Sequence, residues 1–401
     1  MMSMVPLCDL FVSVGESSGD AYGAAIVRAL RQRRPDTVVA AMGGPHLAGA
    51  GAEIEQPIDG MSVMGLWPVL ARLPLFVRAM RHVERTIRAR RPKVLILIDY
   101  PGFNLRLARR LGDLRRDGMR IIHVVAPQVW AWAPRRAKSI AHSVDRMLCF
   151  FPFEPPLFQR FGCQSDHVGH PLIDLVPERI DGGILDRELG LDGRQVLLLA
   201  PGSREREICS LLPSMARAAT AIAARLPQPP VILVSRVPDL PLELYRHATD
   251  LPLVEGRWRE LCARAQVGLI ASGTATLEAG LIGLPHVICY HKDPLSAAIA
   301  RRLIRTDHVG LPNLLCGRRV CPELLQEQFT VPRLVAHALR LWQGPRRADC
   351  QRGLADLRNR LGGGGALERI ATIVDDELGH AQRRLTHATA ADSHARLKTA
   401  K

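Results

Sequence analysis

The stretch Val94-Leu95-Ile96-Leu97-Ile98-Asp99-Tyr100-Pro101-Gly102-Phe103-Asn104 decides the fold class of this chain. It begins with five consecutive aliphatic residues, passes through a Pro-Gly turn and runs into a helical pattern over residues 105–116. A short apolar run without polar alternation is typical of a strand that is covered on both faces. The stretch therefore predicts one strand and one helix of a parallel sheet.

The same alternation of short apolar runs and helical patterns continues on both sides of this stretch. In the first half we expect further strands at 10–14, 38–42 and 121–125 and a helix at 21–33. A break rich in Pro, Gly and charged residues follows near 177–194. The pattern then restarts, with strands at 196–199, 231–234, 267–270 and 286–290 and helices at 208–225 and 274–281. Such alternation predicts an α/β fold.

We expect two Rossmann-like domains, at residues 1–180 and 181–360, followed by a C-terminal segment at 361–401. A chain of 401 residues fits two domains of common size better than one. The C-terminal segment reads as a helix, for which packing back on the first domain is one option, and then as a flexible tail. The tail is expected because its Ala, His, Thr and Arg residues form no sustained apolar stripe.

Composition restricts the class of protein. Apolar residues make up 47% of the chain and charged residues 23%, which is ordinary for a globular protein. No apolar run approaches the roughly 18 to 20 residues that cross a bilayer, and the N-terminus lacks a secretory pattern, so we expect a cytoplasmic protein. The 9 cysteines are an odd number without zinc-finger spacing, and we expect reduced, mostly buried thiols.

The net charge favours an anionic partner. The chain has 54 Lys and Arg against 39 Asp and Glu, a balance of +15. Such a field attracts nucleic acid, anionic lipid or phosphorylated metabolites alike. The basic residues are dispersed and no nucleic-acid recognition motif is present, so a nucleic-acid-binding protein is the weaker alternative.

Three turns in the first half follow predicted strands, where open parallel sheets bind ligands. In Gly15-Glu16-Ser17-Ser18-Gly19-Asp20, the glycines allow an anion or hydroxyl to approach the backbone; alternatively, the segment is a tight turn in which Ser17 or Ser18 caps the helix. Asp99 could accept a proton there, or could be a turn or cap residue. In the third turn, which contains Gln128, Trp130 and Trp132 could stack on a sugar or contact an acyl chain, or they could close the core.

Two turns in the second half suggest nucleotide binding. Gly202, Ser203 and Arg204 place N–H groups and a guanidinium at a helix start, which suits a diphosphate; the alternative is a plain strand-to-helix turn. Ser272, Gly273 and Thr274 form a second small-residue turn at a helix start. Glu278 could accept both ribose hydroxyls there, or it could belong to a capping box, although its spacing from Thr274 is one residue too long.

We expect neither a metal nor another cofactor. Metal-dependent sugar transferases commonly hold a divalent ion with two aspartates at Asp-x-Asp spacing, and this chain has no such pair. The charge of a departing diphosphate would then be met by helix N-termini and Arg204.

Taken together, these motifs and their order resemble the lipid-A-disaccharide synthase family over roughly residues 8–330. Further matching motifs are Phe151-Pro152-Phe153-Glu154, Gly169-His170-Pro171-Leu172, Leu311-Pro312-Asn313-Leu314-Leu315 and Leu324-Leu325-Gln326-Glu327. The resemblance implies a GT-B arrangement, in which two Rossmann-like domains face each other across a cleft. It also implies an inverting transfer of diacylglucosamine from UDP-diacylglucosamine to the 6-hydroxyl of diacylglucosamine 1-phosphate.

The resemblance also assigns residues. Asp99 becomes the candidate general base, and Arg204, Glu278 and Asn313 match nucleotide-binding positions. Tyr290 and Gln326 are implied as further nucleotide contacts. The implied acceptor contacts are Ser17, Gln128, Trp130, Trp132 and Arg301. An isomerase acting on UDP-GlcNAc would share the fold and the nucleotide cradle and is kept as the alternative function.

Substrates with acyl chains imply contact with a membrane surface. Residues 61–82 mix apolar residues with Arg72, Arg78 and Arg81, which fits a peripheral, interfacial segment at the inner face of the inner membrane. The alternative is a buried amphipathic helix broken at Pro68 and Pro74. A homodimer is left open.

Overall fold

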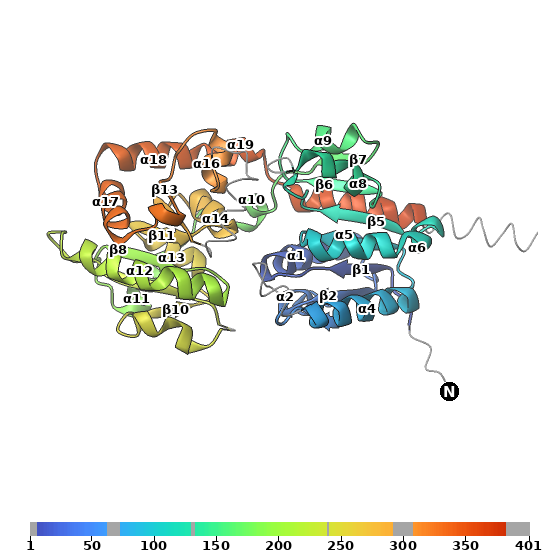
Figure 1. Cartoon of the computed structure of the whole chain (residues 1–401), viewed down its shortest axis with the longest axis horizontal. Coiled ribbons are helices and arrows are strands. Elements are labelled where there is room, and N and C mark those ends of the chain that lie inside the picture. Colours follow the sequence, from blue (N-terminus) through green and yellow to red (C-terminus); the bar gives the residue numbers. More distant parts are fainter. Residues whose placement is uncertain (1–5, 62–72, 130–132, 239, 292–307, 382–401) are drawn as a thin grey trace, which may run out of the picture. The chain divides into compact units, whose positions relative to one another are not determined.

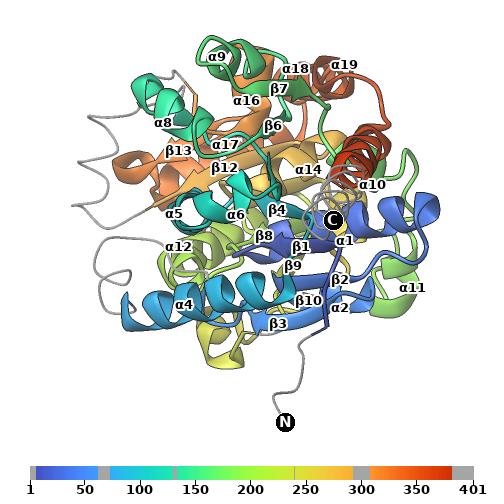
Figure 2. The same ribbon diagram turned by 90° about the vertical axis from the view of Figure 1, so that its right-hand side faces the viewer.

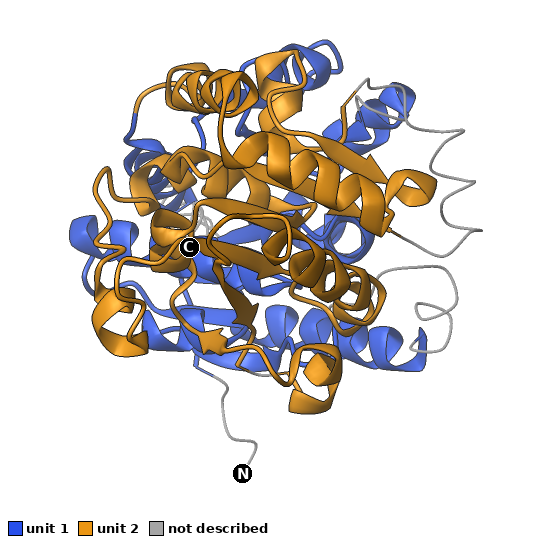
Figure 3. Cartoon of the chain, turned by 90° about the vertical axis from the view of Figure 1, so that its left-hand side faces the viewer, with its two compact units in different colours: residues 1–171, 364–401 blue, residues 172–363 orange. Residues whose placement is uncertain are grey.

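The computed structural model describes residues 6–61, 73–129, 133–238, 240–291 and 308–381. The chain forms two compact units, of which unit 1 combines residues 1–171 with 364–401 and unit 2 contains residues 172–363 (Figure 3). Each unit has one parallel sheet covered by helices (Figure 1), which confirms the predicted α/β class with two Rossmann-like domains. None of the described helices is both long and apolar enough to span a membrane.

Unit 1 contains a seven-stranded sheet in the order β3-β2-β1-β4-β5-β6-β7. Its strands are β1 (Leu10–Ser13), β2 (Val39–Gly43), β3 (Glu53–Pro57), β4 (Val94–Ile98), β5 (Arg120–Val124), β6 (Arg146–Cys149) and β7 (Gln164–His167). Its shorter helical elements are α2 (Pro45–Gly49), α6 (Gly112–Arg116), the 3-10 turn η1 (Pro134–Arg136), α8 (Ala137–Ala141) and α9 (Pro155–Gln159). Its longer helices are α1 (Ser17–Arg33), α4 (Leu73–Arg90) and α5 (Pro101–Arg110).

The helices of unit 1 cover both faces of its sheet. Strand β1 has β2 on one side and β4 on the other, so the winding direction reverses between β1 and β4. In consequence α1 lies on one face, and α4, α5 and α8 lie on the other (Figure 2). The second face is sealed by an apolar cluster to which α4 contributes Met80, Val83 and Ile87, spaced to project from one side of that helix.

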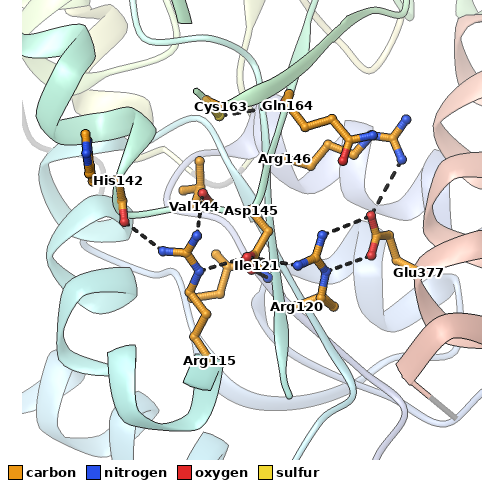
Figure 4. A network of polar contacts seen from close by, with 10 residues as sticks. All are labelled: Arg115, Arg120, Ile121, His142, Val144, Asp145, Arg146, Cys163, Gln164 and Glu377. Carbon is orange, nitrogen blue, oxygen red and sulfur yellow. Dashed lines mark hydrogen bonds and ion pairs between the residues drawn. The ribbon is translucent and has the colours of Figure 1, made fainter. Parts of the chain in front are cut away.

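A helix at residues 366–381 returns the chain to unit 1. Its Glu377 is almost fully buried and accepts a hydrogen bond from Arg120 on β5 at 2.8 Å. Arg146 on β6 lies 3.6 Å from the same carboxylate (Figure 4). Asp145 then joins Arg120 to Arg115 at 3.0 and 2.9 Å, respectively. This network of alternating charges links the helix at 366–381 to β5 and β6. Removing one member would leave a buried charge unpaired, so the network stabilises the attachment of the helix.

Unit 2 contains a six-stranded sheet in the order β10-β9-β8-β11-β12-β13. Its strands are β8 (Val196–Ala200), β9 (Val231–Arg236), β10 (Leu253–Glu255), β11 (Val267–Ala271), β12 (His286–Tyr290) and β13 (Glu323–Leu325). Its helices are α10 (Leu172–Leu175), α11 (Ile184–Leu189), α12 (Glu205–Ala223), η2 (Leu242–Ala248), α13 (Trp258–Arg264), α14 (Thr274–Ile282), α16 (Leu311–Cys316), η3 (Gln326–Gln328), α17 (Val331–Trp342), α18 (Pro345–Ala355) and α19 (Leu357–Leu361). Unit 2 begins at Leu172, ahead of the break at 177–194. Leu185 and Leu191, which lie within that break, belong to the core of this unit.

Several helix boundaries differ from the sequence predictions. The helix expected at 105–116 is two helices and starts earlier, at Pro101, because proline is preorganised for the first helical turn. The helix expected at 21–33 starts at Ser17, and its N-cap is Glu16 without a side-chain cap bond. The alternative in which Ser17 or Ser18 caps this helix is therefore wrong. All 9 cysteines are free, and 8 of them are buried, as expected.

Candidate active site

The β1/β4 edge, defined by the loops 14–17 and 99–101, is the ligand-binding position that the topology of unit 1 provides. Strands β1 and β4 are neighbours, with Ser13 beside Leu97. Their following loops lead to helices on opposite faces of the sheet, which leaves a crevice at the carboxyl end. The structure therefore brings Ser17, which is exposed in the first turn of α1, to the same edge as Asp99.

A buried asparagine joins the two strands at this edge. The Oδ1 atom of Asn104 accepts a hydrogen bond from the Ser13 hydroxyl at 2.8 Å. Its Nδ2 atom donates to the carbonyl oxygen of Asp99 at 2.8 Å, with the carbonyl oxygens of Ser13 and Ile98 at 3.3 Å. Asn104 therefore fixes the backbone of Asp99. The sequence motif contains this residue, but its spacing gave no hint of the role.

The backbone at Asp99 is strained. Asp99 and Tyr100 have φ angles of 48° and 49°, and Val125 at the end of the neighbouring strand has φ 70°. Left-handed conformations are costly for residues other than glycine, and they concentrate at functional sites. The N-cap of α5 is Tyr100, with no side-chain cap bond, so Asp99 is not the cap of that helix. Its half-buried side chain lies at the carboxyl end of the sheet.

Tyr100 accounts for the first glycine of the 15–20 motif. A Cβ atom at Gly15 would collide with the Tyr100 ring, whose hydroxyl donates to the Met61 carbonyl oxygen at 2.9 Å. Burial raises the pKa of this hydroxyl, so it remains a donor. The Tyr100 ring thus takes the space that a side chain at position 15 would need, which explains why this position requires glycine.

The last residue of the same motif also has a structural role. Asp20 is buried and accepts backbone N–H bonds from Gly44, His46 and Leu47 at 2.7, 2.8 and 3.3 Å. It therefore caps the N-terminus of α2 from a distance.

The remaining predicted acceptor contacts are only partly described. Gln128 is exposed beyond the end of β5 and so lies at the carboxyl end of the same sheet. Trp130, Trp132 and Arg301 lie outside the described residues.

The β8/β11 edge, defined by the loops 201–204 and 272–274, is the corresponding position in unit 2. Strands β8 and β11 are neighbours, and the strand order reverses there as it does in unit 1. Gly202 has φ 121°, and Arg204 is the N-cap of α12. The topology therefore brings together the two turns that the sequence selected for nucleotide binding.

An acidic residue occupies the anion position of the first turn. Glu207 accepts a hydrogen bond from the Ser203 N–H at 3.1 Å and from Arg204 at 2.7 Å. A Cβ atom at Gly202 would collide with the same side chain. The Glu207 carboxylate thus uses the donors that a diphosphate would use, and it holds Arg204 in place.

Glu278 lies on α14 behind the second turn. Its two oxygens accept hydrogen bonds from Trp258 Nε1 at 3.0 Å and Arg259 Nε at 2.8 Å. The N-cap of α14 is Gly273, with no side-chain cap bond, so the capping-box alternative is wrong. Each carboxylate oxygen has a second lone pair and could still accept a hydroxyl.

Asn313 is fully buried, and its amide group is used within the protein. Its Nδ2 donates to Cys321 O and to Glu323 at 2.7 Å each, and its Oδ1 accepts the Cys321 N–H at 2.8 Å. Glu323 also accepts the N–H of Gly310 at 3.0 Å. These bonds favour a positioning role for Asn313 over the direct nucleotide contact that the resemblance implied.

Tyr290 and Gln326 follow the same edge. Tyr290 ends β12 and lies beside Leu325 of β13, so Gln326 emerges next to it with φ 51°. Among the described residues, no three His, Cys, Asp or Glu side chains gather into a metal site.

Comparison with known proteins separates the fold from the family. The structure of UDP-GlcNAc 2-epimerase from Neisseria meningitidis bound to UDP-GlcNAc is similar to this chain, with a TM-score of 0.63 at 10% identity. The similarity covers 92% of this chain and 100% of that one. A calicheamicin glycosyltransferase gives a TM-score of 0.57 at 16% identity, covering 94% of this chain and 99% of that one. At such low identity, both similarities establish the GT-B type of fold and do not distinguish an isomerase from a transferase.

The sequence comparisons make this distinction. The lipid-A-disaccharide synthase of Myxococcus xanthus is 39% identical over 371 residues, covering 91% of this chain and 96% of that protein. The family model described as lipid-A-disaccharide synthetase matches residues 10–362, which include both edges. The chain therefore belongs to the lipid-A-disaccharide synthetase family of glycosyltransferases.

Proposed function

We propose that the chain transfers diacylglucosamine from UDP-diacylglucosamine to the 6-hydroxyl of diacylglucosamine 1-phosphate, with inversion at the anomeric carbon. Family membership supports synthesis of the lipid A disaccharide. The observation that carries the site assignment is the strained Asp99–Tyr100 turn, held by Asn104 at the carboxyl end of β4. Backbone strain that the surrounding structure maintains is expected where a catalytic group must be positioned.

In this proposal Asp99 takes the proton of the acceptor 6-hydroxyl while the oxygen of that hydroxyl attacks the anomeric carbon of the donor sugar and UDP departs. General-base assistance of this kind contributes roughly 10²–10⁴-fold in rate. Unit 1 binds the acceptor through the β1/β4 edge, with Ser17 and Gln128 as contacts.

Unit 2 holds the UDP part through the β8/β11 edge. Arg204 and the N–H groups of loops 201–204 and 272–274 stabilise the negative charge that develops on the departing diphosphate. When the donor binds, its phosphate oxygens replace the Glu207 carboxylate as acceptors of the hydrogen bonds from the Ser203 N–H and Arg204. Glu278 accepts hydrogen bonds from the ribose hydroxyls. Tyr290 and Gln326 border the same site. No metal or other cofactor takes part.

A product assay with UDP-diacylglucosamine tests the function. With diacylglucosamine 1-phosphate present, we expect a disaccharide phosphate and UDP in equal amounts, and we expect the same rate in excess chelator. Without acceptor the donor should remain unchanged. Conversion of the donor alone into an isomer would contradict the transferase function, and loss of turnover in chelator would contradict the metal-free mechanism.

The proposed location is the cytoplasm, with peripheral attachment to the inner face of the inner membrane. In the described part of the 61–82 segment, the first turns of α4 expose Leu73, Leu75 and Val77 by 48%, 40% and 38%. The basic residues Arg78 and Arg81 follow in the same helix. Exposed apolar residues beside cations suit an anionic bilayer surface.

Vesicle binding tests this location. We expect the combined Leu73→Ser and Leu75→Ser variant to lose co-sedimentation with anionic liposomes while keeping its far-UV circular dichroism spectrum. Unchanged co-sedimentation would exclude this surface as the attachment site.

A further inference from the structure

Unit 1 has a groove between α5 and the segment formed by η1 and α8. Its volume is about 80 Å³. Leu105 and Ile140 contribute apolar surface, and three arginines line it: Arg106, Arg109 and Arg136. No Asp or Glu is among the described residues that line it. The groove is therefore a basic recess with an apolar component.

Two of these guanidinium groups lack an acidic partner. Within the described part of the chain, Arg106 makes no ion pair or hydrogen bond, and Arg109 donates to the carbonyl oxygen of Leu105 in its own helix, at 3.2 Å. The next residue, Arg110, differs because it pairs with Glu84 at 3.0 Å. Arg115 likewise pairs with Asp145. Positive charge in the groove is thus left for an external anion, whereas the neighbouring arginines are neutralised by the protein.

The groove begins next to the candidate base. Pro101 and Gly102 line it, and they directly follow Asp99 and Tyr100. Gly102 is the second residue of α5, so its N–H belongs to the first turn, where helices favour anions. A Cβ atom at this position would meet nothing within 4 Å, so the backbone is accessible there.

We propose that this groove binds the phosphate monoester of the acceptor, with Arg106 and Arg109 as its main ligands. The inference rests on the proposed function and extends it to substrate recognition. In a sugar 1-phosphate, C1 carries the phosphate and C5 carries the CH₂OH group with the 6-hydroxyl, and both carbons are bonded to the ring oxygen. Because the groove begins at Pro101, two residues after Asp99, a phosphate bound in it leaves the 6-hydroxyl of the same sugar free to reach the carboxyl end of β4.

The assignment also explains how the enzyme could distinguish its two substrates. Donor and acceptor carry the same diacylglucosamine, and they differ in the group on the anomeric oxygen. At neutral pH the phosphate monoester of the acceptor carries close to two negative charges. Each phosphate of the UDP-sugar donor carries less negative charge, because two of its oxygens are bonded to other groups. Paired guanidinium groups favour the monoester, because they form bidentate, charge-assisted hydrogen bonds with it.

Kinetics of the Arg106→Gln/Arg109→Gln variant test the groove. We expect the KM for diacylglucosamine 1-phosphate to rise at least tenfold, while kcat falls by a much smaller factor and the KM for the donor stays the same. The matched control is Arg110→Gln, which removes the same charge from the same helix outside the groove and should behave as wild type. With an acceptor that lacks the phosphate, the double variant should cause no further loss. Equal losses with both acceptors, or none with either, would overturn the proposal.

A binding measurement separates this inference from the proposed function. Titration of the full-length protein with water-soluble glucosamine 1-phosphate, followed by ³¹P NMR, should show binding to wild type and Arg110→Gln and at least tenfold weaker binding to the double variant. Absence of transfer by wild type with any acceptor would reject the function, whatever this titration shows. Equal binding by all three proteins would reject the groove alone.

A third arm distinguishes the acceptor from membrane phosphate. Vesicles of phosphatidylglycerol present phosphate diesters, which are bound by the same guanidinium chemistry. We expect the double variant to co-sediment with them as Arg110→Gln does. Weaker sedimentation of the double variant, with an unchanged KM for the acceptor, would assign the groove to lipid headgroups and overturn the acceptor assignment.

Discussion

The ring of Tyr100 fills the space beside Gly15 that the side chain of any other residue would need. The two residues belong to the loops that follow β4 and β1, so their contact joins both sides of the β1/β4 edge. Any displacement of Tyr100 must act on Asp99, which precedes it in the same strained turn.

This contact predicts the effect of Gly15→Ala. The added methyl group should displace Tyr100 and cost about 1–3 kcal/mol of unfolding free energy, as overpacking typically does. Turnover should fall as well, because Asp99 moves. Urea unfolding and steady-state kinetics provide the measurements. Gly112→Ala is the matched control, since a Cβ atom there meets nothing within 4 Å. A Gly15→Ala cost that stays the same in a Tyr100→Ala background would show that the two residues are not coupled.

The proposed role of Asp99 as general base is tested by Asp99→Asn, which keeps the shape of the side chain and removes its basicity. We expect kcat to fall by roughly 10²–10⁴-fold, with UDP affinity unchanged. Asp117→Asn, an exposed change near the amino-terminal edge of the same sheet, serves as the control. Kinetics and UDP titration calorimetry distinguish the two effects. Full turnover in Asp99→Asn would remove the proposed base.

Arg204 predicts a binding defect in the other unit. Arg204→Ala removes a charged donor from the proposed phosphate position, so UDP binding should weaken by about 1.5–3 kcal/mol. The exposed Arg206 offers a control, because Arg206→Ala removes the same charge two positions further along the chain. Calorimetry with UDP gives the comparison. If both variants weaken UDP equally, net charge and not the Arg204 contact determines the affinity.

Burial of His123 predicts a pH dependence of stability. Burial lowers the pKa of this imidazole from 6.5 to about 4. Between these values the unfolded chain binds a proton that the folded chain does not, so stability falls as the pH falls below 6.5. The contribution at pH 5 is roughly 2 kcal/mol.

Replacing His123 with leucine removes that contribution. The loss of unfolding free energy between pH 8 and pH 5, measured by urea unfolding of both proteins, should be smaller in His123→Leu by about this amount. Parallel pH curves for the two proteins would show that His123 does not contribute.

The sequence alone determined every internal strand except β6, and it selected the two sheet edges at which we propose that ligands bind. Runs such as 94–98 and 196–199 are recognisable because both faces of a central strand are buried and the residues must be apolar throughout. The Gly-rich and Pro-rich turns after them are recognisable because their backbone geometry restricts residue type. Together with the ordered motifs, these signals were enough to place the chain in its family.

Tertiary structure alone decided the edge strands. β3 and β7, with the sequences EIEQP and QSDH, end the sheet of unit 1, and neither was predicted. β10 and β13 end the sheet of unit 2 and were missed in the same way. Edge strands are short and often polar, because one side of the backbone has no neighbour and polar side chains discourage unwanted pairing. The sequence pattern of an edge strand therefore resembles that of a loop, and only its pairing with the rest of the sheet identifies it as a strand.

The division of roles among motif residues also required the structure. Gly15, Asp20 and Asn104 stand in motifs beside assigned site residues, and Asn313 was itself assigned to nucleotide binding. The atoms of all four are used for packing and internal hydrogen bonds. Sequence records only that a residue type is required at a position. Whether a neighbour or a ligand requires it depends on contacts between residues far apart in the chain, and these exist only once the sheets have formed.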